Sequence, residues 1–237
     1  MKMKLHPVHF ISLGPGDAEL ITLKGLRALQ QADCVFCPAT VRRSGEQVSR
    51  SADILRQLAI PEDKIRLFTL PMAMDGSAAA DAYDALFEEV ARLYQQGCSI
   101  GVAAEGDVGV YCTMHYVLER LQHCGIEVEQ VPGIPSFVAS AARAHLHLVS
   151  HNERLIVLPG RAETEELKRL VATLHTVVIM KLSLCAEEVR RFVAQHPLLN
   201  YHYIENTGCE SEYYTADAES IVQRDFPYFS LLIIKHS

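Results

Sequence analysis

Features that mark several protein classes are absent from this 237-residue sequence. It has no stretch of about 18 apolar residues, so no membrane-spanning helix is expected. Its first residues lack the apolar run and cleavage site of a signal peptide. Neither an internal repeat nor a low-complexity segment stands out. The composition, 49% hydrophobic and 22% charged residues, is typical of a globular enzyme rather than of a disordered chain or a coiled coil.

Positive charge and paired metal ligands are also scarce. Lys and Arg number 22 against 29 Asp and Glu, a formal net charge of −7. Non-specific binding to nucleic acid or to an anionic membrane is therefore not expected, although a local basic cleft stays open. Among seven cysteines only Cys34 and Cys37 form a C-x-x-C pair, and the eleven histidines show no tight pairing except His145 and His147. A metal site therefore has little support. Buried, reduced thiols in a cytoplasmic protein are the preferred interpretation.

The first half of the chain alternates between predicted strands and helices. Strands are expected at the short apolar, β-branched runs 8–13, 33–37, 65–68, 98–104 and 126–131. Helices are expected from Thr22, over 78–96 and over 111–124, the last two closed by Gly97 and Gly125. This alternation predicts a parallel sheet with helices on both faces.

A proline-containing segment at 131–135 separates this half from a second α/β pattern. Further strands are expected at 155–158, 177–182, 202–204 and 229–235, and further helices at 136–146, 164–174 and 186–195. The sequence therefore predicts two α/β domains, 1–133 and 134–237, the second with a mixed sheet.

Glycine-containing loops follow predicted strands, at the sheet edge where open parallel sheets bind ligands. The first loop, 13–25, holds Gly14, Pro15 and Gly16 but no G-x-G-x-x-G, so a dinucleotide is not expected. The alternative is a plain strand-to-helix turn that Thr22 caps.

The second loop, 104–113, contains Gly106 and Gly109, which expose main-chain groups. Asp107 either lies against a ligand or caps the helix expected from Tyr111. The third loop, at 131–137, either joins the same site or serves as a rigid connection between the domains.

These loops carry motifs in a fixed order. They read G-P-G-D-x-E-L-x-T-L-K-G at 14–25, E-G-D-x-x-x-Y-x-T at 105–113 and V-P-G-I-x-S-F-x-A-x-A-A-R at 131–143. In order and spacing they resemble the tetrapyrrole methylase family, S-adenosylmethionine-dependent enzymes of cobalamin and sirohaem synthesis. The later segments V-I-M-K (178–181), I-E-N-T-G (204–208) and Y-F-S-L-L (228–232) extend the resemblance over almost the whole chain.

Within that family the chain resembles the subgroup that methylates carbon 20 of precorrin-2 or of its cobalt-containing counterpart. The resemblance rests on V-F-C-P at 35–38 and S-x-S-x-x-I at 49–54, with P-Y-F-S-L-L at 227–232. Two departures stand out. Ser51 replaces the subgroup's small alanine, and Val108 replaces the proline of the family's usual G-D-P, which weakens the argument that the second loop is stiff.

The resemblance implies a class III methyltransferase-like fold with S-adenosylmethionine in a cleft between the two domains. It further implies S-adenosylhomocysteine as product, a tetrapyrrole substrate, a homodimer and no metal. The cofactor-binding residues that it implies are Pro15, Gly106, Asp107, Val110, Tyr111, Thr113, Met180, Tyr228, Ser230 and Leu231. Met180 is alternatively a plain core residue of a strand.

Methyl transfer from a sulfonium needs positioning more than an activated nucleophile. Asp107 is the expected acid/base group for the proton that the ring carbon loses, and orienting a ligand is its alternative role. The substrate is fringed with carboxylates, so cations are expected to bind it. The expected cations are Arg42, Arg43, Arg143 and Lys181, with Arg161 as a further candidate; for each, a solvated surface charge is the alternative.

Other functions stay open on the sequence alone. A methylase of the same fold could act on another corrin carbon, on uroporphyrinogen, on a diphthamide precursor or on ribosomal RNA, the last disfavoured by the acidic charge. A non-catalytic module that binds a tetrapyrrole or a protein is a third class, which the intact glycine motifs disfavour. A nicotinamide dehydrogenase fails on the missing glycine fingerprint.

Overall fold

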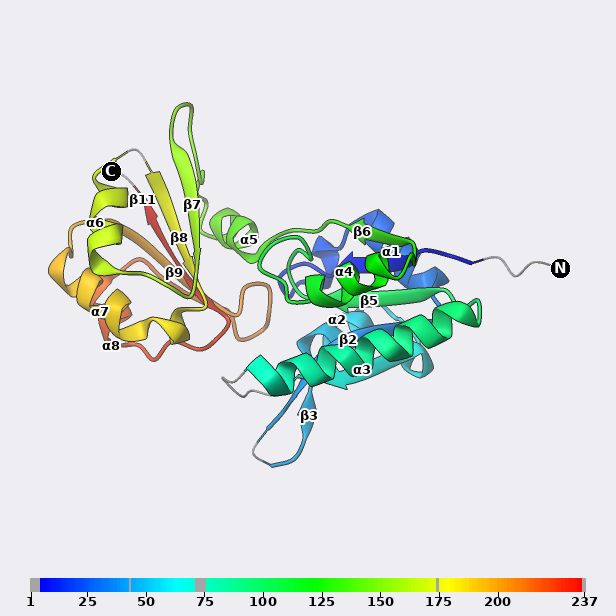
Figure 1. The fold of residues 1–237 in the computed structure, drawn as a ribbon. Helices are drawn as coiled ribbons and strands as arrows, with labels where there is room; N and C mark the ends of the chain where they lie inside the picture. Colours follow the sequence, from blue (N-terminus) through cyan, green and yellow to red (C-terminus); the bar gives the residue numbers. More distant parts are fainter. Residues whose placement is uncertain (1–4, 43, 71–75, 174, 236–237) are drawn as a thin grey trace. The chain divides into compact units, whose positions relative to one another are not determined.

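A computed structural model describes residues 5–42, 44–70, 76–173 and 175–235. The chain divides into two compact units, Met1–Pro135 and Ser136–Ser237 (Figure 1). The expected boundary lay at 133/134 and the observed division lies at 135/136. Among the described residues, none of the helices combines the length and apolar composition that crossing a bilayer requires.

The first unit is built on a mainly parallel sheet. Its strands are β1 (Val8–Ser12), β2 (Cys34–Val41), β3 (Gln47–Val48), β4 (Ile65–Thr69), β5 (Ile100–Ala104) and β6 (Val128–Val131). β2, β5, β1 and β6 lie side by side in that order, all parallel, and β4 pairs in parallel with β2. Among the described strands of this sheet only β3 runs antiparallel, where it pairs with the end of β2.

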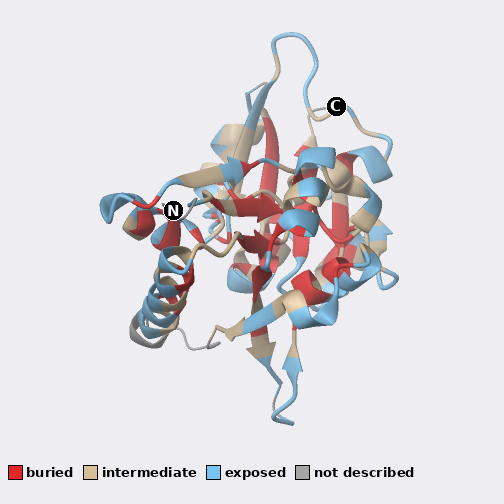
Figure 2. Cartoon of the chain, turned by 90° about the vertical axis from the view of Figure 1, so that its right-hand side faces the viewer, coloured by how far each residue is buried: buried red, intermediate tan, exposed pale blue. Residues whose placement is uncertain are grey.

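Helices cover both faces of this sheet, as predicted. They are η1 (Ala18–Leu20), α1 (Leu23–Gln31), α2 (Arg50–Gln57), η2 (Glu62–Lys64), α3 (Gly76–Gln95) and α4 (His115–His123). Leu29 of α1 and Leu55 of α2 belong to the core of one face. Val90 of α3 and Leu121 of α4 belong to the core of the other. Strand side chains alternate between the two cores, so the sheet is buried on both sides, and Figure 2 shows the buried residues concentrated in the strands.

Helix starts follow the sequence at one point and depart from it at another. Thr22 caps α1, and its Oγ1 accepts a hydrogen bond from Gly25 N–H at 3.1 Å. The helix expected over 111–124 begins only at His115. Tyr111 has φ +50°, a left-handed conformation that is incompatible with a right-handed α-helix, so α4 cannot include this residue.

Two elements of the first unit were not predicted. β2 and β3 pair as an antiparallel hairpin, and α2 follows from Arg50. The hairpin is mainly polar, whereas α2 has an apolar face, with Ala52, Ile54 and Leu55 buried, that the sequence prediction overlooked. Arg42 therefore lies in a hairpin turn and not in a plain loop.

The second unit has the predicted mixed sheet. Its strands are β7 (Arg154–Pro159), β8 (His175–Met180), β9 (Asn200–Glu205), β10 (Tyr213–Thr215) and β11 (Ser230–Lys235), in the order β10-β9-β11-β8-β7. β7 and β8 are parallel, and the other pairs are antiparallel.

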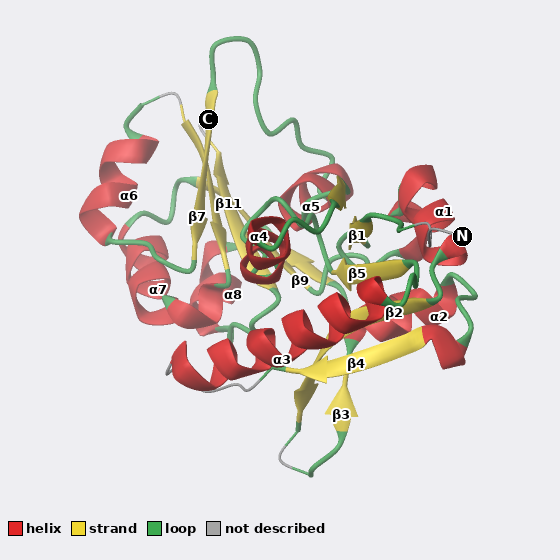
Figure 3. Cartoon of the chain, turned by 45° about the vertical axis from the view of Figure 1, so that its right-hand side comes forward, coloured by secondary structure: helices red, strands yellow, loops and turns green. Residues whose placement is uncertain are grey.

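Helices flank this second sheet too. They are α5 (Ser136–Arg143), α6 (Thr164–Val171), η3 (Leu182–Leu184), α7 (Ala186–Gln195) and α8 (Ala218–Gln223). Three of them, α6, α7 and α8, lie along one face of the sheet (Figure 3) and pack Leu167, Phe192 and Ile221 into a single core. The short β10 and α8 were not predicted from the sequence.

Candidate functional site

The loops after β5, β1 and β6 lie next to one another. These strands are neighbours and run in parallel, so their carboxyl ends share one edge of the sheet. The motifs at 14–25, 105–113 and 131–143 all begin at this edge. The structure therefore gathers in space three motifs that are far apart in the chain.

The first two loops are joined main chain to main chain. Gly14 N–H donates to the Gly106 carbonyl at 3.1 Å, and Gly106 N–H donates to the Gly14 carbonyl at 2.6 Å, as an isolated antiparallel bridge. Both glycines have positive φ, +80° and +70°, where a side chain would be strained. A Cβ added to Gly106 would meet no atom within 4 Å, so neighbouring residues do not fill the space on that side of this glycine.

Asp107 ties the second loop to the third. Its Oδ1 accepts a hydrogen bond from Gly109 N–H at 2.8 Å, and its Oδ2 accepts one from Gly133 N–H at 2.7 Å. It therefore does not cap α4, which was the alternative role considered for it. Both carboxylate oxygens hold main-chain groups, which fixes the shape of the loops.

Ser12, at the end of β1, makes a further link that the sequence did not reveal. Its side chain is fully buried, and its Oγ accepts a hydrogen bond from Val108 N–H at 2.9 Å. Proline, the family's usual residue at position 108, has no N–H and could not make this bond. The departure from the family's pattern therefore supplies a hydrogen bond between the end of β1 and the second loop.

Gly133 allows the third loop to approach closely. A Cβ at this position would lie 2.4 Å from the Cβ of Ser12 and 3.1 Å from the Gly106 carbonyl oxygen. No side chain fits there without a shift of the backbone. We call Ser12, Gly14, Gly106, Asp107 and Gly133 the glycine-turn cluster.

The other predicted cofactor residues of the first unit lie around this cluster. Pro15 is buried beside Gly14, Val110 is half-buried, and its N–H donates to the Asp107 carbonyl at 3.1 Å. Tyr111 is 45% exposed. Thr113 is exposed, and its Oγ1 accepts a hydrogen bond from the hydroxyl of Tyr83 at 2.5 Å.

The predicted residues of the second unit also gather, at the end of β8 and the start of β11. Met180 and Leu231 are paired across these strands. Lys181 lies with its Nζ 5.7 Å from the centre of the Tyr228 ring, and the hydroxyl of Ser230 donates to the Pro227 carbonyl at 2.5 Å. Met180 is half-buried, so it is more accessible than the fully buried Val178 and Ile179 before it.

Two of the predicted substrate-binding cations have acidic partners. Arg42 pairs with Glu46 at 3.0 Å, and Arg143 pairs with Glu212 at 2.6 Å. Arg43 lies outside the described residues. Each of these pairs leaves the arginine side chain more than half exposed, at 63% and 70%, so a carboxylate ligand could exchange for the acidic partner.

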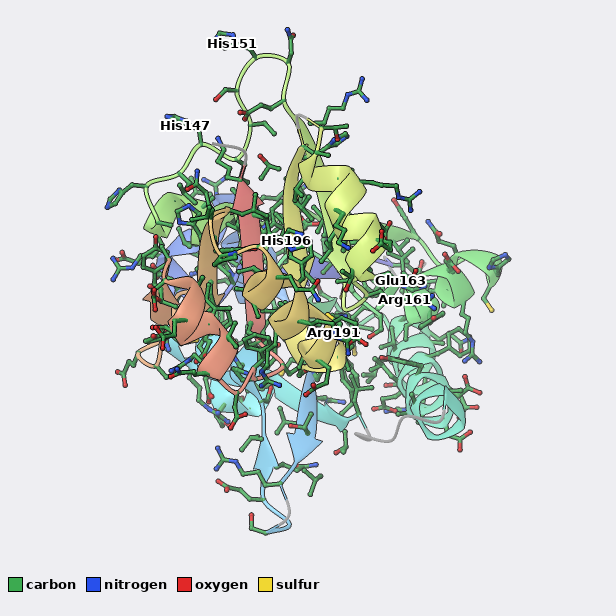
Figure 4. The ribbon with its side chains drawn as sticks, turned by 90° about the vertical axis from the view of Figure 1, so that its left-hand side faces the viewer. His147, His151, Arg161, Glu163, Arg191 and His196 are labelled. Carbon is green, nitrogen blue, oxygen red and sulfur yellow. The ribbon has the colours of Figure 1, made fainter. Side chains whose placement is uncertain are left out.

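Figure 4 labels one predicted cation, Arg161, and two histidines, His147 and His151, in loops of the second unit. Arg161 is exposed in the loop between β7 and α6, two residues before Glu163. His147 and His151 lie on the loop from α5 to β7, at the opposite end of β7. Among the described residues no group of three His, Cys, Asp or Glu side chains could hold a metal ion.

The C-x-x-C pair is split between the two cores of the first unit. Cys34 packs on the face covered by α3 and α4, whereas Cys37 packs on the face covered by α1 and α2. Residues three apart in a strand point to opposite faces, so the two thiols cannot bind one metal. Burial raises the pKa of Cys37 to about 11, which keeps this thiol protonated at neutral pH.

Glu105, next to the glycine-turn cluster, was not predicted as a site residue. Its side chain is 20% exposed, and burial raises the pKa of its carboxyl group while Arg50 opposes that shift. Arg50 Nε lies 3.4 Å from Oε2, and the Ser51 hydroxyl lies 3.5 Å from Oε1. The letter E in the second motif was the only signal in the sequence.

A two-unit α/β chain with linked glycine loops at the carboxyl edge of its parallel sheet belongs to the class of α/β proteins that bind a small ligand there. The family model for Tetrapyrrole (Corrin/Porphyrin) Methylases matches residues 7–221, and the chain belongs to this family.

Curated relatives match nearly the full length of the chain. The precorrin-2 C(20)-methyltransferase of Sinorhizobium sp is 31% identical over 94% of this chain and 93% of its own length. The cobalt-precorrin-2 C(20)-methyltransferase of Salmonella typhimurium is 27% identical over 96% of this chain and 95% of its own.

Solved structures show the same fold. The uroporphyrin-III C-methyl transferase of Thermus thermophilus, in complex with S-adenosylhomocysteine, has a TM-score of 0.67 at 20% identity and covers 97% of both chains. A cobalt precorrin-4 methyltransferase has a TM-score of 0.69 at 19% identity, over 97% of this chain and 94% of its own. The predicted fold class is thereby confirmed.

Proposed function

We propose that this chain is an S-adenosylmethionine-dependent methyltransferase that acts on carbon 20 of precorrin-2 or of its cobalt-containing counterpart, in cobalamin biosynthesis. Family membership supports the cofactor and the tetrapyrrole substrate. The names of the near full-length relatives support carbon 20 as the position of transfer.

The glycine-turn cluster is the observation that carries the proposal. It brings the loop after β1 and the loop after β5 into direct main-chain contact and leaves open space beside Gly106. Had these loops lain at different edges of the sheet, they could not form one binding site. The residues present therefore fit a compact ligand that takes hydrogen bonds from exposed main-chain groups.

In the proposed site the cluster residues bind the methionine part of the cofactor, with Pro15 against it and main-chain groups of 106–110 as hydrogen-bond partners. The hydroxyl of Thr113 adds a side-chain contact. In the second unit, Met180 packs on the adenine, and the main chain of Tyr228, Ser230 and Leu231 binds its edge. Tyr111 adds an exposed aromatic surface at the end of the glycine loop.

The bound cofactor supplies an activated methyl group: the S–CH₃ bond breaks as the C20–CH₃ bond forms, giving S-adenosylhomocysteine, and C20 then loses its proton. The protein's part is to align the ring carbon with the methyl group and to exclude water. Asp107 as the proton acceptor stays a prediction. Its two hydrogen bonds to loop N–H groups favour a positioning role instead.

Arg42, Arg143 and Lys181 are the described cations that we propose for the substrate carboxylates. Arg42 and Arg143 already hold a carboxylate, of Glu46 and Glu212. They thus have the geometry to bind a second acidic group in exchange. The proposal also includes a homodimer, and light scattering of the purified protein measures this oligomeric state. It places the protein in the cytoplasm, where free thiols such as the buried Cys34 and Cys37 stay reduced.

Purified precorrin-2 and its cobalt-containing counterpart, each incubated with the protein and ¹³C-methyl S-adenosylmethionine, test this function. The expected product carries one new ¹³C-methyl group, assigned to C20 by NMR. A methyl group on another ring carbon would overturn the subgroup assignment and keep the family chemistry. Cofactor binding without any transfer to either ring would contradict the enzyme assignment.

A further inference from the structure

The S-x-S-x-x-I motif at 49–54 has a place in the fold that the proposed function does not use. Ser49 caps α2, because its Oγ accepts a hydrogen bond from Ala52 N–H at 3.0 Å. The same hydroxyl donates to the Pro38 carbonyl in β2 at 2.6 Å. Ile54 lies in the core on this face of the sheet. The start of α2 is therefore fixed to β2, near the carboxyl edge of the sheet.

The next two residues of α2 face Glu105. Ser51 is fully buried, and its hydroxyl donates to Glu105 Oε1 at 3.5 Å. Arg50 brings its guanidinium to Oε2 of the same carboxylate, with Nε at 3.4 Å. Both charged side chains are largely buried, at 23% and 20% exposure, so water and salt screen this pair less than a surface ion pair.

Glu105 is also covalently joined to the glycine-turn cluster. The residue after it is Gly106, whose N–H and carbonyl both bond to Gly14. The carboxylate that contacts α2 thus belongs to the residue directly before the Gly14–Gly106 bridge. A chain of contacts leads from α2 through Glu105 to the two glycines.

We infer that Glu105 is a positioning residue, which holds the second glycine loop against α2 and thereby sets the affinity for S-adenosylmethionine. The inference rests on the proposed function. In this role the carboxylate touches neither cofactor nor substrate. Ser51, which replaces the subgroup's alanine, provides the hydroxyl that supports this arrangement.

The role distinguishes Glu105 from Asp107, although the two are neighbours in the loop. Asp107 bonds to main-chain N–H groups of the loops themselves. Glu105 instead contacts two side chains of a helix, the charged Arg50 and the neutral Ser51. Loss of the Glu105 charge should thus leave the local turn intact and loosen its attachment to the rest of the unit.

Glu105→Gln tests this role, since glutamine keeps the size and a hydrogen-bond acceptor but loses the charge that pairs with Arg50. We expect the KM for S-adenosylmethionine and the Kd for S-adenosylhomocysteine to rise about tenfold, the effect of one charge-assisted bond, while kcat changes less than about twofold. Titration calorimetry and initial rates of methyl transfer measure these constants. A purely structural role would lower the thermal midpoint without this separation of KM from kcat.

Glu62→Gln is the matched control. It removes another acidic partner of α2, in the exposed ion pair of Glu62 with Arg56 at 2.8 Å, which lies away from the glycine loops at the other end of the helix. The control should bind S-adenosylhomocysteine like the wild type. Equal affinities for the Glu105→Gln and Glu62→Gln variants would overturn the positioning role.

Ser51→Ala keeps the inference testable if Glu105→Gln fails to fold. It removes one hydroxyl and restores the subgroup's residue, so a rise of about threefold in the Kd is expected from the loss of one long hydrogen bond, at 3.5 Å, to the Glu105 carboxylate. An unchanged Kd would contradict the inference. A wild-type chain that binds no S-adenosylhomocysteine would overturn the proposed function together with it, whereas normal wild-type activity with an unaffected Glu105→Gln would overturn the inference alone.

Discussion

The glycine-turn cluster of the first unit and a buried ion pair of the second unit both place a carboxylate at the end of a strand, but with different partners. Asp107 accepts hydrogen bonds from two main-chain N–H groups. Glu205, at the end of β9, accepts bonds from the guanidinium of Arg224, with Nη2 at 2.9 Å, and from the hydroxyl of Tyr203.

The surroundings of the two carboxylates differ as much as their partners. Glu205 is 6% exposed, and the Arg224 guanidinium lies 3.6 Å from the centre of the Tyr213 ring, so aromatic side chains fill the neighbourhood. Next to Gly106, by contrast, the space for a side chain is open. A carboxylate that holds only main-chain groups leaves room for a ligand, whereas one neutralised by a packed cation stabilises the sheet.

The largest effect that would separate the two regions is expected from Asp107→Ala. Without the carboxylate, the Gly109 and Gly133 N–H groups lose their acceptor and the loops misalign the methyl donor. We expect kcat/KM for methyl transfer to fall about 100-fold, roughly 2.7 kcal/mol of transition-state stabilisation.

Asp217→Ala is the control for that substitution. Asp217 caps α8 in the second unit and also accepts a main-chain hydrogen bond, from Ser220 N–H at 2.8 Å. Its loss should lower the urea midpoint slightly, because the helix cap is lost, and leave kcat/KM within about twofold of the wild type. Equal losses of activity in the two variants would remove the distinction between the regions.

The opposite result is expected for Glu205→Gln. Arg224 loses its counter-charge, and because its side chain is about one-third exposed we expect a cost of about 2 kcal/mol, below the range for a fully buried pair. Urea unfolding followed by circular dichroism measures this cost. The affinity for S-adenosylhomocysteine should stay within about twofold of the wild type, and a tenfold loss would mean that the ion pair belongs to the binding site.

A smaller effect is expected from Ser12→Ala, which leaves the buried N–H of Val108 without an acceptor. The expected cost is about 1 kcal/mol in the free energy of unfolding. A matched comparison is Ser140→Ala, which removes the buried hydroxyl contact to Thr207 in the second unit at 2.7 Å. Only Ser12→Ala should also weaken cofactor binding. If both variants weakened it equally, the distinction between the two regions would be wrong.

The smallest effect concerns the ion-pair cluster of His9 in β1, Lys24 in α1 and Glu129 in the edge strand β6. The hydrogen bond from Lys24 lowers the pKa of Glu129, so the stabilisation is present above the ordinary glutamate pKa of about 4.3 and is lost as the pH falls through the lower value in the folded state. Wild type and Glu129→Gln should differ in urea midpoint at pH 7 and converge near pH 3. A constant difference over this range would refute the assignment.

The sequence predicted the parts of this comparison that depend on local patterns. Apolar runs placed the buried strands, and the motifs placed Gly14, Gly106 and Asp107 in loops after β1 and β5. That these two loops lie side by side followed from the predicted parallel sheet, because neighbouring parallel strands end at the same edge. The second unit's mixed sheet was also correct, although β10 is three residues long and was too short to detect.

Pairings over long distances in the chain were out of reach. The Ser51–Glu105 contact joins residues that are 54 positions apart, and neither residue type announces its partner. Capping of a helix at Tyr111 was one of the roles open to Asp107 in the sequence. Its bond to Gly133 could not be predicted, because that bond depends on the position of β6 beside β1 in the sheet. The space beside Gly106 depends in turn on all these contacts.

A crystal structure of the protein with bound S-adenosylhomocysteine tests the central claim most directly. The account predicts that the methionine part of this ligand lies beside Gly106, with polar atoms about 3 Å from main-chain groups of residues 106–110. Density for the ligand at any other place, with the space next to Gly106 left to solvent, would contradict it.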